Sequence, residues 1–545
     1  MTIQDTLFTK ARISILFSLS LLLATQLSAQ ILTSTNLPII VVNTDDEEIP
    51  DEPKIDGTMS IIFNGEGITN NVNDPFNYYD GRIGIETRGN STQGFDKKTY
   101  SLELRDADNE DLSVNLFGMG AEEDWILHAM VIDKSQLRIP MSFYFFQQMG
   151  HYAAKWRYVE LIVNDEYRGL YILTERIKRD DDRVDIAKLD EDDLSGDAVT
   201  GGYILRIDWL EDFDDDDGFE SAYDSQGGIP MTFQWYYPKA DNIQAEQAQY
   251  IENWMNDFED AVFSPDYTNE QGLRYSDYIN LNSFVDFLLI NEFTKNSDGY
   301  KLSSYIHKDR DSDGGKLAAG PIWDFDQTYG VSTVCSSNDF TGWTYLQNQD
   351  GCEDLESMPM WWQSMMQDTL FQNRLQCRWI QFRNSFLRAD NINSWIDTHV
   401  DLIAGAIDRN FTLWDDFIGE PIWIEPEPIP QSYPEEIQVL KSWITNRLNW
   451  MDNNLPGNCT DIVSTSDINS LNTISVYPNP GHSLITIESN ITSPVDFELY
   501  SLVGIRIMEG TINSNRHEVD ISQLPDNVYL LRVGEQVLKV VKTQE

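Results

Sequence analysis

Two carboxylates lie two residues apart in the segment Trp323-Asp324-Phe325-Asp326. If this segment is extended, Asp324 and Asp326 point to the same side, because side chains alternate along a strand. The apolar neighbours Ile322, Trp323 and Phe325 predict partial burial, and a buried carboxylate needs a cation or hydrogen-bond donors. Such a pair suits Mg²⁺ or Ca²⁺. The alternative is a solvated acidic turn in an acidic protein.

Three further polar groups could bind phosphate or move a proton. The turn Arg88-Gly89-Asn90-Ser91 precedes Lys97-Lys98, and such a loop can present backbone N–H groups and a lysine to phosphates. The alternative is a surface turn with solvated lysines. Glu175 ends an apolar strand, where it pairs with a buried lysine or is an ordinary strand-end charge. Asp298 lies in a polar turn after an apolar helix.

The elements that must position these residues follow from hydrophobic periodicity. Residues 164–168 between two of the strands predict a hairpin turn. Strands dominate the first half and helices the second, which predicts the α+β class. A strand-rich lobe followed by a helical lobe is also the layout of kinase folds, an analogy only. Alternating runs predict strands over 59–63, 100–104, 158–163, 169–173 and 202–207, and helical runs cover 134–149, 245–262, 281–294 and 375–388.

Composition and the N-terminus indicate an exported protein. The 545-residue chain has 38 Lys and Arg against 90 Asp and Glu, a net charge of −52, which argues against binding nucleic acid or an anionic membrane. Residues 1–29 have a basic start, an apolar stretch and a small-residue cleavage site, and so predict a signal peptide rather than a membrane anchor. No later segment is apolar enough to span a membrane.

Composition shifts divide the rest of the chain. We expect an acidic linker over 30–54, a large domain over 55–456, a second linker over 457–472 and a small β-sandwich over 473–545. Export favours disulfides over a metal site for the cysteines, with three pairings open. Acidic stretches at 211–218 and 309–314 are expected to be solvated loops rather than Ca²⁺ sites. The four cysteines are Cys335, Cys352, Cys377 and Cys459.

The motifs together resemble the spore-coat-protein-H (CotH) family of atypical secreted kinases. The matching stretches occur in family order over roughly 55–455 and include residues 88–91, 97–100, 124–138, 169–175, 201–203, 296–298 and 320–326. The resemblance implies a kinase-like, two-lobed domain that uses ATP with Mg²⁺ or Mn²⁺ to phosphorylate Ser/Thr of proteins. The chain departs from ordinary kinases because it has no G-x-G-x-x-G-x-V loop and no H-R-D, and Asp-Phe-Asp replaces Asp-Phe-Gly.

The resemblance also implies roles for single residues. Lys98 would contact the α- and β-phosphates, and Glu175 would hold Lys98, as in the kinase Lys–Glu pair. Asp298 would orient the acceptor hydroxyl or take its proton. The metal ligands would be Asp324 and Asp326, and the weaker candidates for phosphate contact are Arg88 and Arg138.

The tail resembles a type IX secretion (Por) C-terminal sorting domain. Its matching segments include Val476-Tyr477-Pro478-Asn479-Pro480 and Tyr529-Leu530-Leu531-Arg532-Val533. The resemblance implies export through the outer membrane to the cell surface by the type IX machinery, and the alternative is a plain adhesive β-module. The leading hypothesis is therefore an exported protein kinase. The competing one is a non-catalytic surface module that binds glycan or protein through the same cleft.

Overall fold

The chain divides into two compact units, Met1–Asn458 and Cys459–Glu545. The computed structural model describes residues 32–543 apart from 90, 211–216, 350–351, 353–357, 415–416, 460–473, 478–480, 490–494, 502–505, 513–515, 523, 526 and 534–535. The expected signal peptide over 1–29, most of the second linker and most of the acidic stretch at 211–218 therefore lie outside the described residues. Each unit is considered by itself below.

The first unit begins with a closed β-barrel. Side chains of alternating residues, such as Ile83 and Ile85 on one strand and Tyr171 and Leu173 on another, fill its interior. The hairpin predicted at 164–168 joins two barrel strands, and Asn164 and Asp165 have positive φ values of 48° and 61°, as tight hairpin turns require. In barrel order the strands are β10 (Trp156–Val163), β11 (Glu166–Glu175), β9 (Asp124–His128), β6 (Thr99–Arg105), β5 (Tyr79–Arg88), β3 (Ile55–Ile62) and β2 (Ile39–Asn43).

Strand β2 corrects the expected linker over 30–54. It closes the barrel by pairing in parallel with β10 and antiparallel with β3. Ile39, Ile40 and Val42 are fully buried, because a run of β-branched residues packs well in a sheet that is covered on both faces. The acidic, proline-containing character of 44–54 hid this short strand.

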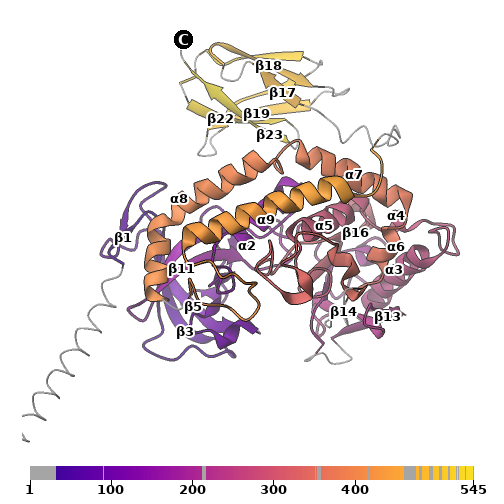
Figure 1. Cartoon of the computed structure of the whole chain (residues 1–545), viewed down its shortest axis with the longest axis horizontal. Helices are drawn as coiled ribbons and strands as arrows, with labels where there is room; N and C mark the ends of the chain where they lie inside the picture. The colour runs from indigo at the N-terminus through magenta and orange to yellow at the C-terminus, as the bar shows by residue number, and fades with distance from the viewer. Residues whose placement is uncertain are drawn as a thin grey trace, which may run out of the picture. The chain divides into compact units, whose positions relative to one another are not determined.

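A five-stranded antiparallel sheet forms the second layer of the unit, at the opposite end from β3, β5 and β11 (Figure 1). The short pairs β1 (Ser34–Thr35) with β4 (Asn70–Asn71) and β7 (Val114–Asn115) with β8 (Ala121–Glu122) lie outside both sheets. The sheet's strands, in order, are β13 (Gly218–Asp224), β14 (Pro230–Tyr237), β12 (Tyr203–Ile207), β15 (Ser304–Lys308) and β16 (Leu317–Ala319).

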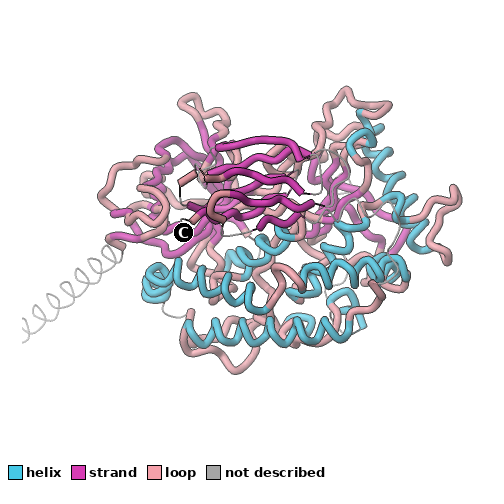
Figure 2. Tube along the Cα trace, turned by 90° about the horizontal axis from the view of Figure 1, so that it is seen from above, coloured by secondary structure: helices cyan, strands magenta, loops and turns pink. Residues whose placement is uncertain are grey.

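Eight α-helices are described in this unit, and most of the long ones gather along one side (Figure 2). One apolar core runs through these helices, the five-stranded sheet and the outer face of β9 and β11. The mixed content agrees with the α+β class. The helices are α2 (Arg138–Gln148), α3 (Ala245–Phe263), α4 (Tyr275–Tyr278), α5 (Leu281–Thr294), α6 (Trp361–Met365), α7 (Thr369–Arg383), α8 (Ala389–Leu413) and α9 (Tyr433–Asn454).

Helix α5 lies at the centre of this core. The Asn280 side chain caps its start by accepting a hydrogen bond from Ser283 N at 3.3 Å. Lys295 ends it in the left-handed conformation, with φ of 49°. Most of the helix is buried, and its buried carboxylates are paired, Asp286 with Arg378 and Glu292 with Arg447. Its end therefore sets the position of the polar residues that follow, including Asp298.

Two long helices connect the barrel to the helical core. Helix α8 packs on β11, and α9 packs on both α5 and α8 (Figure 1). Asn410 of α8 accepts a hydrogen bond from Leu170 N at 3.1 Å, and Arg409 forms an ion pair with buried Glu160 of the barrel. These contacts restrain the barrel relative to the helices.

The cysteines agree with an oxidising compartment. Cys335 and Cys352 are bonded to each other, and Cys377 and Cys459 are also disulfide-bonded. All four lie among the described residues, and none of them is free. In the surface turn at 309–314, the carboxylate of Asp311 forms an ion pair with the buried ammonium of Lys308 at 2.9 Å.

The second unit is all-β, as predicted. Its two sheets share one apolar core, to which Ile485 and Val519 contribute from one sheet and Leu499 and Leu531 from the other. This is the arrangement of a β-sandwich. One sheet contains β17 (Ile474–Tyr477), β18 (Leu484–Ser489) and β21 (Arg516–Asp520), and the other contains β20 (Arg506–Ile512), β19 (Val495–Ser501), β22 (Asn527–Val533) and β23 (Gln536–Lys542).

Candidate active site

Asp324 lies on the loop that follows β16. Strands β15 and β16 are antiparallel neighbours, which brings Ser303, just before β15, beside the segment that follows β16. Ser303 Oγ donates a hydrogen bond to Asp324 Oδ2 at 2.8 Å. Both residues have left-handed backbones, with φ of 44° at Ser303 and 54° at Asp324. Such conformations are costly in residues other than glycine and concentrate at functional sites.

The left-handed residue changes the expected geometry of the Asp324 and Asp326 pair. The segment is not extended at Asp324, so strand alternation does not put the two carboxylates side by side. Asp324 faces Ser303 and Arg88, whereas the charges nearest to Asp326 include Asp298 and Asp324. The two charges still influence each other.

Asp298 is held against the same loop by hydrogen bonds. Ser297 N donates to Gln327 O at 3.3 Å, and Gln327 Nε2 donates to Asp298 Oδ2 at 3.1 Å. Ser332 Oγ also donates to Gln327 Oε1 at 3.1 Å. Gln327 therefore joins the turn after α5 to the loop that carries Asp326, and it orients the Asp298 carboxylate.

Asp326 is the most deeply buried of the three carboxylates, with 8% of the residue exposed. Burial raises its pKa well above the ordinary value, and the charges of Asp324, Asp298 and Asp133 raise it further. Burial also raises the pKa of Asp324, opposed by the Ser303 hydrogen bond and the positive charge of Arg88. The loop therefore collects negative charge in a place where water cannot stabilise it.

This charge fits a divalent cation, because a bound ion would offset both the burial and the mutual repulsion of the carboxylates. The oxygens of Asp298, Asp324 and Asp326 do not all lie within 4.8 Å of one another. Within the described chain, three acidic groups meet that distance only at residues 122–124. There, Lys178 Nζ already neutralises them, at 2.9 Å from Glu122 and 3.2 Å from Asp124.

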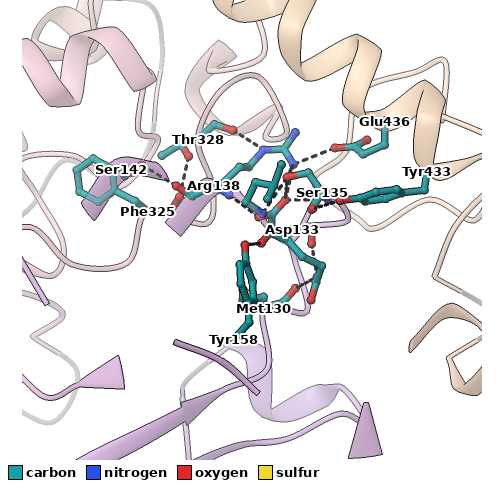
Figure 3. A network of polar contacts seen from close by, with 12 residues as sticks. Met130, Asp133, Ser135, Arg138, Ser142, Tyr158, Phe325, Thr328, Tyr433 and Glu436 are labelled. Carbon is teal, nitrogen blue, oxygen red and sulfur yellow. Dashed lines mark hydrogen bonds and ion pairs between the residues drawn. The ribbon is translucent and has the colours of Figure 1, made fainter. Parts of the chain in front are cut away.

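Arg138 is buried, and its side chain lies between Thr328 and Glu436 (Figure 3). Its guanidinium pairs with Asp133 at 2.5 Å and Glu436 at 2.9 Å, and its Nε donates to Thr328 O at 3.0 Å. Burial lowers the pKa of Arg138, but the two carboxylates raise it above its ordinary value overall. Arg138 therefore ties α2, α9 and the carboxylate loop together, and its donors face protein acceptors.

Arg88 reaches the site from the barrel, at the end of β5. Its guanidinium lies 5.8 Å from the ring centroid of Trp323. Burial lowers the pKa of Arg88, and the negative charge of Asp324 opposes this shift. On β9, His128 faces the same region, and burial together with the charges of Arg88 and Lys97 lowers its pKa to about 3. His128 is therefore neutral at physiological pH.

The structure does not bring Lys98 and Glu175 together. Lys98 Nζ donates to Gln93 O at 2.6 Å. Glu175 is buried and accepts hydrogen bonds from Lys155 N at 2.7 Å and the Tyr152 hydroxyl at 3.0 Å, with Lys155 Nζ at 3.5 Å. Burial raises the pKa of Glu175. The phosphate role of Lys98 and the supporting role of Glu175 remain predictions from the resemblance.

Three contributors to the site were not identified from the sequence. Ser303 carries no local signal, because its role depends on the pairing of β15 with β16. Gln327 lies next to the Trp323–Asp326 motif and could have been included with it. Arg176, whose charge acts on Arg88, follows Glu175 directly, and strand alternation could have placed it on the outside of the barrel, as it places Arg88.

Comparison with known families covers both units. A family model described as a secretion system C-terminal sorting domain matches residues 475–544. This domain indicates secretion through the type IX system to the cell surface. No curated protein matches the chain significantly. Over the described residues, no helix combines the length and the apolar character needed to cross a membrane.

The first unit also matches a family model. The model described as CotH kinase protein aligns with residues 85–451, well over half of the chain. The matched range contains Arg88, Asp298, Asp324 and Asp326. The chain therefore belongs to the CotH kinase protein family.

Proposed function

We propose that this exported protein is a kinase that transfers the γ-phosphoryl group of ATP to Ser or Thr hydroxyls of surface or secreted proteins. The observation that supports this proposal best is the convergence of one arginine and three aspartates from separate segments. Arg88 comes from the barrel, Asp298 from the turn after α5, and Asp324 and Asp326 from the loop after β16. Phosphoryl transfer requires mainly positioning and charge neutralisation from a protein.

The roles follow from the surroundings of each side chain. Asp324 and Asp326 would hold Mg²⁺ or Mn²⁺, which neutralises phosphate charge when bound. Asp298, oriented by Gln327, would hold the acceptor hydroxyl and accept its proton. Arg88 would donate hydrogen bonds to a phosphate. Arg138 is a positioning residue for the carboxylate loop.

A transfer assay tests the proposal. Purified full-length protein is incubated with γ-labelled ATP, Mg²⁺ or Mn²⁺, and a serine-rich acceptor protein. We expect labelled phosphoserine or phosphothreonine in the acceptor or in the protein itself. Asp298→Asn should reduce the rate at least about 10²-fold, the usual contribution of a general base. Asp390→Asn, which changes an exposed aspartate of α8, is the matched control and should label normally.

Two results would contradict the proposal. One is the absence of labelling by the folded wild-type protein with both metals and several acceptors. The other is full labelling by a folded Asp298→Asn variant, which would remove Asp298 from the mechanism. The non-catalytic alternative predicts the first result together with glycan or protein binding that survives the Asp298 substitution.

A further inference from the structure

We propose that Arg176 and Arg88 form a paired guanidinium site for the phosphate chain of the nucleotide, with Arg88 nearer to Asp324. This inference rests on the proposed function, because it assigns the phosphate-binding groups of the same site. It adds Arg176, which no sequence motif or family comparison singled out. It also gives to two arginines the role that a lysine has in ordinary kinases.

Strand alternation puts both arginines on the outside of the barrel, on strands that β9 and β6 separate. On β5, Ile83 and Ile85 point into the barrel, so Arg88, an odd number of residues further, points outward. On β11, Tyr171 and Leu173 point inward, and Arg176 directly after the strand has the outward parity. This outer face packs against the rest of the first unit, where the carboxylate loop lies.

The charged residues that act on each arginine indicate which of the two is nearer to Asp324. Arg88 is influenced by both Asp324 and Arg176. Arg176 is influenced by Tyr236, Asp124 and Tyr305, with Asp324 absent from its main neighbours. The geometry agrees with this order, because Arg88 lies 5.8 Å from the ring centroid of Trp323, the residue before Asp324, whereas Arg176 lies 3.7 Å from Asp124. A phosphate chain with its metal on Asp324 would pass Arg88 first and Arg176 second.

The guanidinium of Arg88 has N–H donors that find no acceptor among the described residues. No described residue accepts a hydrogen bond from its guanidinium or forms an ion pair with it, and the guanidinium lies over the ring of Trp323, 5.8 Å from the centroid. A partly buried arginine normally finds acceptors. The guanidinium fork suits two phosphate oxygens, and a phosphate would supply the missing acceptors.

The protein engages only part of the Arg176 guanidinium, through a hydrogen bond with the Tyr236 side chain and a long contact with a carboxylate. Its closest carboxylate oxygen, on Asp124, is 3.7 Å away, and the Arg176 side chain is 36% exposed. Lys178 Nζ shares the same carboxylate at 3.2 Å. Asp124 is therefore already partly neutralised, and Arg176 retains donors for an anion.

Electrostatics gives a reason for keeping two cations together. The chain has 90 acidic against 38 basic residues, so its overall field repels phosphates. Asp324, Asp124 and Asp208 also face this region. Two adjacent guanidinium groups create local positive charge despite this field, and they repel each other until an anion binds.

The lysines of the neighbouring loop are engaged elsewhere. Lys97 is buried, and its ammonium donates to the carbonyl oxygens of Ala129 at 2.8 Å and Leu170 at 2.7 Å. Lys98 Nζ donates to Gln93 O. The arginines thus have the more available donors.

Binding of inorganic tripolyphosphate by the full-length protein in EDTA, measured by calorimetry, tests the inference without metal or turnover. Arg176→Met and Arg88→Met should each weaken binding about 10- to 100-fold, the value of a charge-assisted hydrogen bond. Arg176→Lys should recover part of the loss, because it keeps the charge and loses the fork. Arg388→Met, at an exposed arginine before α8, should bind like the wild type. The same series with ATP distinguishes recognition of phosphate alone from recognition of the nucleotide.

The outcomes separate this inference from the kinase proposal. Folded Arg176→Met protein with wild-type tripolyphosphate affinity and a wild-type KM for ATP overturns the inference, even if labelling occurs. If Arg176→Met does not fold, wild-type affinity in folded Arg176→Gln has the same meaning. Arginine-dependent tripolyphosphate binding without any labelling supports the inference and counts against the kinase. A raised KM for ATP with a nearly unchanged kcat in Arg176→Met supports both.

Discussion

Replacing Arg138 by methionine should destabilise the first unit without removing phosphate binding. The side chain is 2% exposed, and its donors are used by Asp133, Glu436 and Thr328 O. Methionine fills much of the same volume but leaves the two carboxylates without their cation. If Arg138 instead contacted phosphate, as the family resemblance suggested, its loss would reduce affinity and leave stability intact.

The magnitude follows from the two buried carboxylates. Breaking a buried ion pair by removing one partner costs about 3–5 kcal/mol. Asp133 keeps the backbone N–H groups of Ser135 and residue 138 as donors, at 2.9 and 2.7 Å, so most of the cost should come from Glu436. Adding Glu436→Gln to Arg138→Met should therefore recover about 1–3 kcal/mol, the penalty of a buried unsatisfied group.

Urea denaturation followed by tryptophan fluorescence measures this effect. All 15 tryptophans precede residue 451, so the signal reports the first unit alone. The control Arg388→Met changes an exposed arginine and should not shift the midpoint. An Arg138→Met protein with wild-type stability and a tenfold loss of tripolyphosphate affinity would refute the structural role. Failure of Glu436→Gln to restore any stability would refute the assignment of the cost to Glu436.

Two further predictions concern other parts of the chain. Glu259 of α3 is buried and accepts a hydrogen bond from Ser221, and burial raises its pKa to about 8 from 4.5. Between pH 4.5 and about 8, the Glu259 carboxyl is therefore protonated in the native state and ionised in the unfolded state. The stability that this proton contributes is complete below pH 4.5 and is lost as the pH rises to about 8. The free energy of unfolding, measured by urea denaturation between pH 5 and 8, should therefore fall by about 1.4 kcal/mol per pH unit because of Glu259. Glu259→Gln should remove this dependence, whereas Glu246→Gln on the exposed side of the same helix should keep it. Deletion of residues 473–545 should leave the protein in the periplasm, and protease accessibility on intact cells measures this. Fusing the same residues to a periplasmic protein should bring that protein to the surface, and normal display of the truncated chain would contradict the sorting role.

Local patterns were sufficient for many elements of the fold. The alternating run over 158–163, the turn at Asn164-Asp165 and the run over 169–173 predicted the β10–β11 hairpin, because side-chain period and turn chemistry are properties of neighbouring residues. The apolar run over 281–294 predicted α5 with its bounds. Short or acidic-flanked strands such as β2 were missed, since four apolar residues give little periodic signal.

The predicted helices did not include α8 or α9, although the sequence of α8 has a helical pattern of apolar residues. Ile392, Ile396, Ile403 and Ile407 recur at helical spacing and are buried along α8. Many intervening residues are Asp, Asn and Thr, which have low helix propensity. Packing on β11 and α9 stabilises this helix, as tertiary contacts often override propensity.

The sequence by itself determined the residue types of the site, their order, the α+β class and the sorting tail. These depend on composition, local period and motif spacing. Only the tertiary structure decided which charged side chains pair with one another. Arg138 meets Glu436, which is 298 residues away, Glu175 meets Lys155 rather than Lys98, and Arg88 faces Asp324. A local pattern shows that a side chain is charged and that its strand is buried, but the packing of distant elements determines which opposite charge satisfies it.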